Sequence, residues 1–360
     1  MLELSIVVPS FNERDNIREL ISRLDAVLAG IRWEVIYVDD DSPDGTSDLV
    51  RSIAREDSRV RCLHRIGRRG LSRAVVEGVL ASSAPSIVVM DADLQHDETL
   101  LPRMLAKVRE DKLDFVVASR YCEGGSVGEW DNKRAAMSRF ATYLAKLVVA
   151  SPLTDPMSGF FLVQREAFDR AVRRLSGEGY KILLDLFASS PTPPRYAELP
   201  FVFRERFAGE SKLDSAVLWQ YIMLILDKRF GHILPPRLIL FSLVGGSGLF
   251  VHFLILFLAF RVGNVPFAVG QIVATLAAMT SNYVLNNFLT YRDRRLRGMH
   301  FFTGLLSFYL VCGVGAVGNV GVANMIFNRQ QEWWLAGLAG VVVGTVWNYV
   351  ASAMFTWKKS

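Results

Sequence analysis

Three acidic residues follow an apolar run in the segment VVMDADLQHD, residues 88–97. Asp91 and Asp93 are separated by one residue, and Gln95 follows at the same spacing. Hard oxygen ligands at this spacing suit Mg²⁺ or Mn²⁺, which bind a few carboxylates together with the phosphate oxygens of a substrate. Such a metal would neutralise the charge that develops on a leaving diphosphate. A capped loop before a helix is the alternative interpretation.

A second acidic run, DDDSPDGT, begins at Asp39, and both runs end a segment rich in Val and Ile. Such segments are typical of β-strands, and helical patterns lie between them. This alternation predicts a mostly parallel α/β sheet with helices on both faces, in which ligands bind at the carboxyl ends of the strands. The acidic runs lie at those ends, which favours the metal site over a capped loop. The predicted strands are residues 4–8, 34–40, 60–64, 86–92 and 114–119.

The last third of the chain is apolar and predicts a membrane domain. Each of its apolar stretches is longer than the roughly 20 residues needed to cross about 30 Å of hydrocarbon. Lys and Arg concentrate before the first stretch, between the second and third, and after the fourth. The positive-inside rule therefore predicts a cytoplasmic N-terminal domain and C-terminus, with Trp333, Trp334 and Trp357 in aromatic belts. The four predicted spans, all without Asp, Glu, Lys or Arg, are 238–260, 265–290, 301–327 and 333–357.

The four stretches contain an internal similarity. NYVLNNFLTYR, from Asn282, resembles NYVASAMFTWK, from Asn348. FSLVGGSG, residues 241–248, resembles FYLVCGVG, residues 308–315. The pattern indicates a duplicated helical hairpin, and chance similarity between apolar sequences is the alternative.

A short apolar segment, residues 214–231, connects the two halves. It is too short to span a bilayer, so we interpret it as a helix in the membrane interface, with Trp219 and Tyr221 near the headgroups. A buried helix of the soluble domain is the alternative.

Charge and cysteine content exclude several classes of protein. The formal net charge is +5, but no block of Lys and Arg with interleaved aromatic residues occurs, which argues against nucleic-acid binding. The three cysteines, Cys62, Cys122 and Cys312, are scattered and form no C-x-x-C motif. This argues against a zinc site or a disulfide framework. The N-terminal apolar run is too short for a signal peptide.

The motifs together resemble a known family. VVPSFNERDNI, VDDDSPDGTSD and MDADLQHD are similar to motifs of family 2 glycosyltransferases of the GT-A fold. GRRGLSRAVVEG, DPMSGFFLV and RERFAGESKL resemble the dolichol- or polyprenyl-phosphate mannose synthase branch, and the last 120 residues or so resemble a GtrA-like four-span domain. The resemblance implies a GT-A domain over residues 1–212, an interfacial helix and linker over 213–236, and an all-α four-helix transmembrane domain over 237–360.

The resemblance also implies site residues. Phe11 stands where many relatives have Tyr, which keeps a stacking surface but removes a hydroxyl. Asp91, Asp93 and Arg120 are expected to be catalytic. The metal is expected at Asp91, Asp93 and Gln95, and the acceptor phosphate at Arg120, Arg134 and Ser138. The expected donor-binding residues are Pro9, Phe11, Glu13, Val38, Asp40, Asp91, Ala92, Asp93, Lys181, Arg206 and Lys212.

The implied reaction is the inverting transfer of a sugar, expected to be mannose from GDP-mannose, to a polyprenyl or dolichyl phosphate at the cytoplasmic face of the cell membrane. No catalytic His is evident, and a phosphate monoester needs no general base because it is already an anion at neutral pH. UDP-glucose or another sugar nucleotide is an alternative donor. A different alternative is that the membrane domain translocates the lipid-linked sugar.

Overall fold

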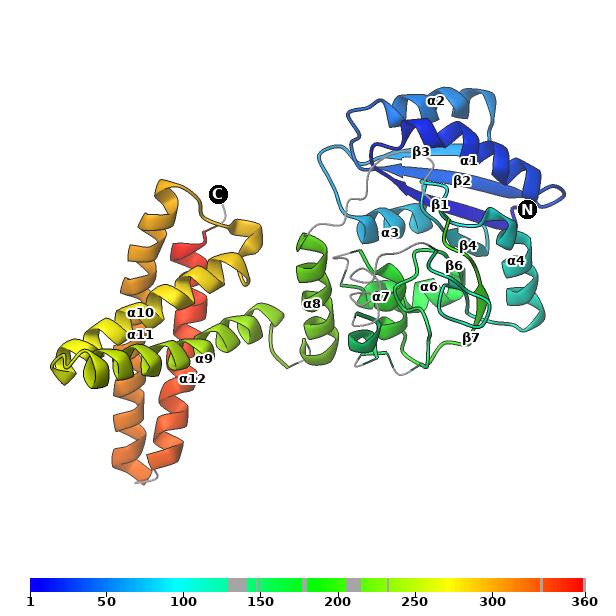
Figure 1. The fold of residues 1–360 in the computed structure, drawn as a ribbon. Helices are drawn as coiled ribbons and strands as arrows, with labels where there is room; N and C mark the ends of the chain where they lie inside the picture. The colour runs from blue at the N-terminus through cyan, green and yellow to red at the C-terminus, as the bar shows by residue number, and fades with distance from the viewer. Residues whose placement is uncertain are drawn as a thin grey trace. The chain divides into compact units, whose positions relative to one another are not determined.

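The chain forms two compact units, Met1–Arg229 and Phe230–Ser360, in the computed structural model (Figure 1). The expected three-part division at residues 212 and 236 stays a prediction. The structure describes residues 1–128, 141–146, 148–149, 151–176, 180–204, 215–231, 233–330 and 333–358. Within these ranges, the side chains of some helical residues are not described, namely those of residues 215–219, 268, 320, 323–324, 327–330 and 333–338.

A seven-stranded sheet in the order β3-β2-β1-β4-β6-β5-β7 forms the centre of the first unit. Neighbouring strands are parallel except around β6, which is antiparallel to both β4 and β5. The mostly parallel fold class and all five predicted strands are confirmed, and the sequence did not predict β6 or β7. The strands are β1 (Leu4–Ser10), β2 (Trp33–Asp39), β3 (Val60–His64), β4 (Ser86–Val89), β5 (Phe115–Ser119), β6 (Phe161–Gln164) and β7 (Tyr196–Pro200).

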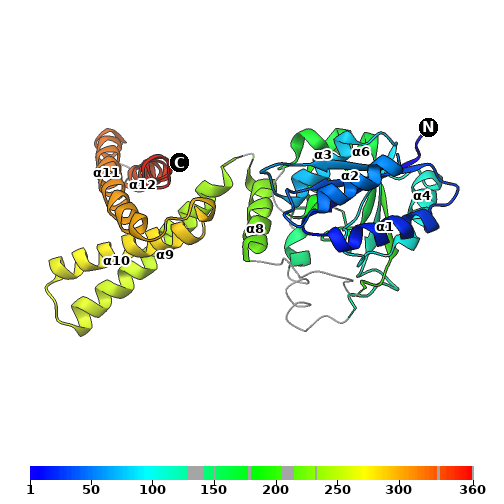
Figure 2. The same ribbon diagram turned by 90° about the horizontal axis from the view of Figure 1, so that it is seen from above.

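Helices cover both faces of the sheet (Figure 2). The alternation of side chains along each strand divides the core, so that Ile6 packs with one layer of helices and Val7 with the other. Gly78 of the second layer lies so close to the sheet that a Cβ there would be 2.4 Å from Val7. α1 (Arg14–Val27), α2 (Thr46–Glu56) and α4 (Leu101–Glu110) form the first layer, and α3 (Leu71–Ala81), α6 (Arg165–Ala171), α7 (Ile182–Ser189) and α8 (Ser215–Phe230) contribute to the second.

Helix α8 packs on the sheet unit. Tyr221 and Leu224 are each 4% exposed and belong to its hydrophobic core. Lys228 forms an ion pair of 2.7 Å with the buried Asp185 of α7. The prediction that Tyr221 lies near the headgroups was therefore wrong, because burying its ring in the core removes more apolar surface from water than an exposed position would. The side chain of Trp219 lies outside the described residues.

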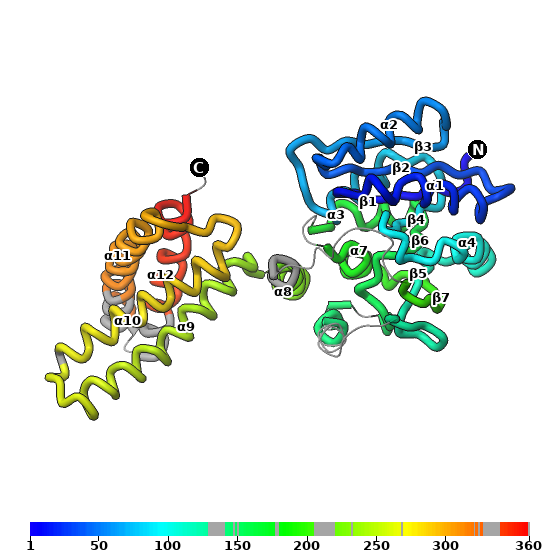
Figure 3. Tube along the Cα trace, turned by 45° about the horizontal axis from the view of Figure 1, so that its top comes forward, coloured from blue at the N-terminus to red at the C-terminus, as the bar shows by residue number. Residues whose placement is uncertain are grey.

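The second unit consists of two helical hairpins, α9 with α10 and α11 with α12 (Figure 3). Within the described residues, three helical segments are long and apolar enough to cross a membrane, namely Pro236–Val262, Met299–Asn319 and Ala339–Thr356. The predicted second span coincides with α10, which is not among the three, so the number of four spans stays a prediction. The helices are α9 (Pro236–Phe257), α10 (Phe267–Phe288), α11 (Met299–Gln330) and α12 (Trp333–Ala351).

Equivalent glycines hold each hairpin together. A Cβ added to Gly248 of α9 would be 2.4 Å from Oδ1 of Asn282 in α10. A Cβ added to Gly315 of α11 would be 2.1 Å from Oδ1 of Asn348 in α12. These are the last glycines and the first asparagines of the two pairs of similar sequences. Glycine at these two positions therefore permits the same close approach in both hairpins.

Aromatic contacts cross between the hairpins in the same duplicated way. The rings of Phe241 and Tyr349 lie 5.7 Å apart, and so do those of Phe308 and Tyr283. Phe241 and Phe308 are equivalent in the repeat, as are Tyr283 and Tyr349. Each hairpin therefore gives a Phe to the other hairpin's Tyr, which supports the duplication over chance similarity.

Trp357 lies at the centre of the second unit's aromatic core. It is 0% exposed, its ring stacks on Tyr291 at 4.2 Å, and its Nε1–H donates to Oδ1 of Asn287 at 3.0 Å. The prediction that it belongs to an aromatic belt was wrong, because stacking and a partner for its N–H both favour the interior. The side chains of Trp333 and Trp334 lie outside the described residues.

Candidate active site

The predicted polar residues gather at one edge of the sheet. β1, β2, β4 and β5 run in one direction, so their carboxyl ends meet at that edge. Asp40 directly follows β2, Asp91 follows β4 after Met90, and Arg120 directly follows β5.

Asp40 is 8% exposed and firmly held. It accepts hydrogen bonds from the guanidinium of Arg65 and, at 2.7 Å, from the N–H of Gly70. Burial raises the pKa of Asp40, and these two partners offset the effect only in part. Arg65 is itself 1% exposed and also reaches Glu77 at 3.2 Å.

Five other predicted donor residues lie at or near the carboxyl ends of β1, β2 and β4. The guanidinium of Arg69 lies 4.2 Å from the ring centre of Phe11. Glu13 accepts a hydrogen bond of 2.7 Å from the side chain of Asn16. Pro9 is part of β1, whereas Val38 and Ala92 are 0% and 1% exposed and pack in the core. The side chains of Val38 and Ala92 therefore support this end of the sheet from the hydrophobic core.

The Asp91–Gln95 segment has an unusual backbone. Leu94 has a φ of 62°, in the left-handed region that residues other than Gly rarely adopt. Oδ1 of Asp93 accepts the N–H of Gln95 at 3.2 Å, and Nε2 of Gln95 donates to the carbonyl of Arg204 at 3.0 Å. The side chain of Asp91 is 40% exposed, whereas Asp93 is 5% exposed.

The chemistry of these donors fits a hard divalent cation. Asp91, Asp93 and Gln95 supply carboxylate and amide oxygens, which Mg²⁺ and Mn²⁺ prefer. In the described part of the chain, no group of three or more His, Cys, Asp or Glu side chains is placed to hold a metal by itself. A metal at these three residues would therefore depend on two carboxylates, an amide and the substrate.

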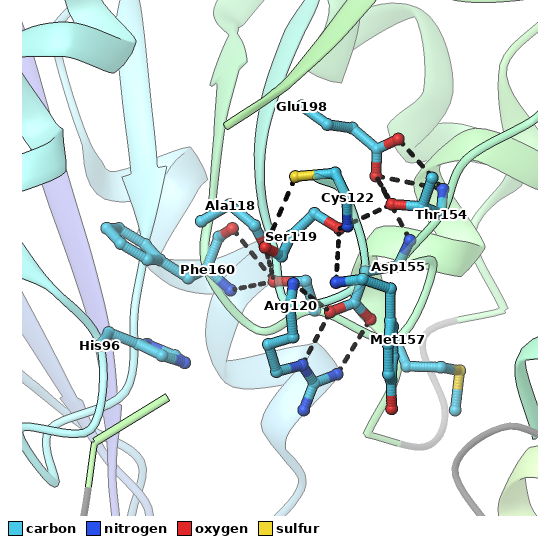
Figure 4. Close-up of polar contacts among 12 residues, drawn as sticks. His96, Ala118, Ser119, Arg120, Cys122, Thr154, Asp155, Met157, Phe160 and Glu198 are labelled. Atoms are coloured by element: carbon cyan, nitrogen blue, oxygen red, sulfur yellow. Dashed lines mark hydrogen bonds and ion pairs between the residues drawn. The ribbon is translucent and has the colours of Figure 1, made fainter. Parts of the chain in front are cut away.

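His96 holds the backbone of Asp91 in place. Its Nδ1 accepts the backbone N–H of Asp91 at 3.0 Å, and its ring stacks on Phe160 with centroids 5.1 Å apart (Figure 4). Burial lowers the pKa of His96 to about 4, so the ring is neutral near pH 7. The His96 ring therefore holds the backbone of Asp91 without carrying a charge.

Arg120 is fixed by Asp155, a carboxylate to which the sequence analysis assigned no role. Its Nε and Nη2 donate to the two oxygens of Asp155 at 2.7 and 2.9 Å, and its backbone N–H donates to Oδ2 at 3.2 Å. Asp155 is 0% exposed. Burial opposes the charge on Arg120, but the hydrogen bonds and charge of Asp155 outweigh it and raise the pKa of Arg120.

Lys181 is the second cation of the site and precedes α7. Its Nζ donates to the carbonyl of Met157 at 3.4 Å. Burial, together with repulsion from Arg120, lowers the pKa of Lys181 to about 8, while the charges of Asp155 and Asp91 act in the opposite direction. Asp91 also raises the pKa of Arg120. The three side chains are therefore close enough to act on one another electrostatically.

A hydrogen-bonded chain extends from β7 to the end of β5 (Figure 4). Glu198 of β7 accepts the hydroxyl of Thr154 at 2.7 Å, its N–H at 3.1 Å, and the N–H of Asp155 at 3.3 Å. The hydroxyl of Ser119 lies 2.6 Å from that of Thr154. Because the Thr154 proton points to Glu198, Ser119 is the donor in this contact. Its oxygen then accepts the N–H groups of the two residues after Arg120, at 3.2 and 3.1 Å.

The structure brings Asp91, Asp93, Gln95, Arg120 and Lys181 to one part of the sheet edge. Sequence reasoning missed the roles of Arg65, Thr154, Asp155 and Glu198. The DPMSG motif carried a signal for Asp155, whereas Glu198 lies in an unremarkable strand. Four predicted residues lie outside the described part of the chain, namely Arg134, Ser138, Arg206 and Lys212.

Comparison with known families assigns both halves of the chain. Residues 5–171 match the family model Glycosyl transferase family 2. Residues 240–357 match the model GtrA/DPMS, transmembrane domain. The second unit is therefore a membrane domain.

Individual proteins match as well. A solved structure of glucosyl-3-phosphoglycerate synthase from Mycobacterium tuberculosis with Mn²⁺, UDP and phosphoglyceric acid is 19% identical, with a TM-score of 0.46 over 63% of this chain and 78% of that chain. A dolichol-phosphate mannosyltransferase of Mycosarcoma maydis is 37% identical over 63% of this chain and 80% of its own. A dolichol-phosphate mannosyltransferase of Pyrococcus furiosus is 33% identical over 99% of both chains. The chain therefore belongs to the dolichol-phosphate mannosyltransferase family, and it joins a family 2 glycosyltransferase domain to a GtrA/DPMS transmembrane domain.

Proposed function

We propose that the protein transfers mannose from GDP-mannose to a polyprenyl phosphate, with inversion at the anomeric carbon. The observation that carries the proposal is the match to the Pyrococcus furiosus dolichol-phosphate mannosyltransferase over 99% of both chains, because it includes the sheet unit and the membrane unit together. The geometry of the sheet edge supports it. Two cations, Arg120 and Lys181, lie within electrostatic reach of Asp91.

Asp91, Asp93 and Gln95 would hold Mg²⁺ or Mn²⁺. When bound, the metal would offset the negative charge of the donor diphosphate as it leaves. Asp91 is the more exposed of the two carboxylates, so it would be the more accessible one to a complex of metal and sugar nucleotide. His96 fixes the backbone of Asp91 without competing for the metal, because its Nδ1 already accepts a hydrogen bond.

Arg120 and Lys181 would bind the phosphate groups. A planar guanidinium held on one edge by Asp155 keeps a fixed orientation, which suits the recognition of a phosphate. Lys181, with a pKa of about 8, is mostly charged at pH 7 and adds a second positive charge. Together they would hold an anionic acceptor beside an anionic donor, whose charges otherwise repel each other.

The acceptor itself explains the absence of a general base. A phosphate monoester is an anion at neutral pH, so its oxygen attacks the sugar without first losing a proton. The neutral, buried His96 accepts a proton only near pH 4 and is unsuited to serve as a base. Positioning and charge neutralisation are therefore the contributions that the protein must make.

We further propose four membrane spans with the sheet unit and the C-terminus in the cytoplasm, in an integral protein of the cell membrane. The arginine-rich segment between α10 and α11 supports this orientation. Sugar nucleotides would then reach the site from the cytoplasm, while the isoprenoid tail of the acceptor stays in the bilayer. The spans would keep the acceptor site near the headgroups and raise its effective concentration.

Purified enzyme, a polyprenyl phosphate and a panel of radiolabelled sugar nucleotides test the proposal. We expect transfer from GDP-mannose with Mg²⁺ or Mn²⁺, a β-linked product and no transfer in chelator. Preferential use of UDP-glucose would replace the donor assignment. An enzyme that transfers no sugar to any polyprenyl phosphate would overturn the proposal.

A further inference from the structure

Arg120 is attached to the sheet through a carboxylate network that reaches a different strand. We name this network the Arg120 clamp, and it consists of Ser119, Thr154, Asp155 and Glu198. Its members come from β5, from the loop before β6 and from β7. Thr154 and Glu198 are 44 residues apart in the sequence. Their contact therefore exists only when β7 has added to the edge of the sheet beside β5.

The clamp acts on both the side chain and the backbone of Arg120. Asp155 holds the guanidinium by two hydrogen bonds of 2.7 and 2.9 Å. Glu198 in turn holds Asp155 and Thr154 through their N–H groups, at 3.3 and 3.1 Å. Ser119, linked to Thr154 at 2.6 Å, fixes the turn that follows Arg120. One carboxylate on β7 therefore determines where the guanidinium points.

The charge arrangement argues against a proton-transfer role for Asp155. Asp155 is fully buried, and its two oxygens already accept three hydrogen bonds from Arg120. Replacing a buried ion pair of this kind by apolar residues is often neutral or stabilising, so stability alone is a weak reason for its presence. A fixed orientation of the guanidinium is a stronger one.

We propose that Thr154 and Glu198 are positioning residues that act through Asp155 to aim Arg120 at the phosphate of the acceptor lipid. The inference rests on the proposed function and adds residues that set the affinity for the acceptor. It makes the outer strand β7 part of the acceptor site, whereas the expected metal residues follow β4. We expect donor binding, which involves the ends of β1, β2 and β4 as well as Lys181, to depend on the clamp much less than acceptor binding does.

Thr154→Val tests the proposal, because it removes the hydroxyl and keeps the shape of the side chain. Thr154→Ser retains the hydroxyl. Ser5→Ala is the matched control. Ser5 also donates a buried hydroxyl to a carboxylate, that of Glu34, at 2.7 Å, but this contact lies at the amino ends of β1 and β2. The measurements are the KM for a short-chain polyprenyl phosphate, kcat, the Kd of the sugar nucleotide and the Tm of each full-length variant.

We expect Thr154→Val to raise the acceptor KM by about tenfold to a hundredfold, because a small misplacement of a positioning group has effects of this size. The Kd of the sugar nucleotide should stay within about twofold, and Thr154→Ser should restore the acceptor KM. Ser5→Ala should lower Tm without changing the acceptor KM. If Thr154→Val does not fold, Glu198→Met should show the same selective rise, because it removes the oxygen that accepts hydrogen bonds from Thr154 and Asp155.

Two failures are distinguishable. An unaltered enzyme that is active, with Thr154→Val or Glu198→Met behaving like Ser5→Ala, overturns the clamp alone. Equal losses of donor and acceptor affinity in Thr154→Val also overturn it. An unaltered enzyme that transfers no sugar to any polyprenyl phosphate overturns the proposed function, and with it the acceptor role of the clamp.

Discussion

The sheet unit and the membrane unit bury polar groups in opposite ways. At the sheet edge the buried polar contacts are charged, as in the pair of Arg120 with Asp155 and that of Arg65 with Asp40. In the aromatic core of the membrane unit the corresponding contact is neutral, between Nε1–H of Trp357 and Asn287. The membrane unit also contains an ion pair between Arg237 and Asp293, but the two side chains are 30% and 39% exposed.

This difference indicates which buried contacts serve function and which serve stability. A buried charge pair contributes little net stability, so its presence points to a task that needs charge. A neutral hydrogen bond within stacked rings stabilises a fold without that cost, and charges within a membrane are expensive. We therefore expect substitutions in the two regions to affect different measurements.

The largest effect is expected at the metal ligands. Asp91→Asn keeps the shape of the side chain but removes a charge, and it should lower the transfer rate by at least about 10³-fold, the upper range for loss of one electrostatic contact. Donor affinity, measured by calorimetry with Mn²⁺ present, should fall as well. Chelator should abolish the activity of the unaltered enzyme. Full activity of Asp91→Asn in chelator would contradict the metal assignment.

The pair of Arg120 and Asp155 tests the comparison directly. Arg120→Met alone leaves a buried charge without its partner and should cost about 3–5 kcal/mol in the free energy of unfolding. Combining it with Asp155→Leu should recover that stability but not the use of the acceptor. Thermal unfolding and the acceptor KM measure the two effects. Recovery of both the stability and the acceptor KM, or of neither, would contradict the proposed difference between the two regions.

Trp357 should show the reverse behaviour. Trp357→Ala removes the centre of the aromatic core and should cost about 3–5 kcal/mol, measured by unfolding in detergent. Its kcat with a short-chain acceptor should stay near that of the unaltered enzyme at a temperature where both are folded. Phe355→Ala is the control, because Phe355 is 65% exposed and should have little effect. A selective loss of acceptor affinity in Trp357→Ala would place part of the acceptor site in the membrane unit.

The smallest effect is a change in pH dependence. Lys181 has a lowered pKa of about 8, so it is protonated below this pH and loses its charge as pH rises through 8. The kcat/KM for the sugar nucleotide should therefore fall about tenfold between pH 7 and pH 9. Lys181→Arg should remove this high-pH decline, because Arg keeps its charge. An unchanged decline in Lys181→Arg would assign it to another group.

The sequence predicted the strands that carry the donor and metal residues, because their Val-rich cores and acidic ends are local signals. It missed β6, a four-residue strand inserted antiparallel between β4 and β5, and β7, a half-buried edge strand that contains Glu198. Both depend on contacts with distant strands. The clamp residues were missed for the same reason, since each is an ordinary polar residue until β7 brings Glu198 to Thr154.

The position of Trp357 in the chain affects how the membrane unit is assembled during synthesis. Tyr283 and Tyr291 belong to the first hairpin, but their ring contacts with Phe308 and Trp357 come from the second. At about 5–20 residues per second, translation from Tyr291 to Trp357 takes on the order of ten seconds. During this interval the rings of Tyr283 and Tyr291 lack their contacts with Trp357. The aromatic core is therefore completed only after both hairpins have been made.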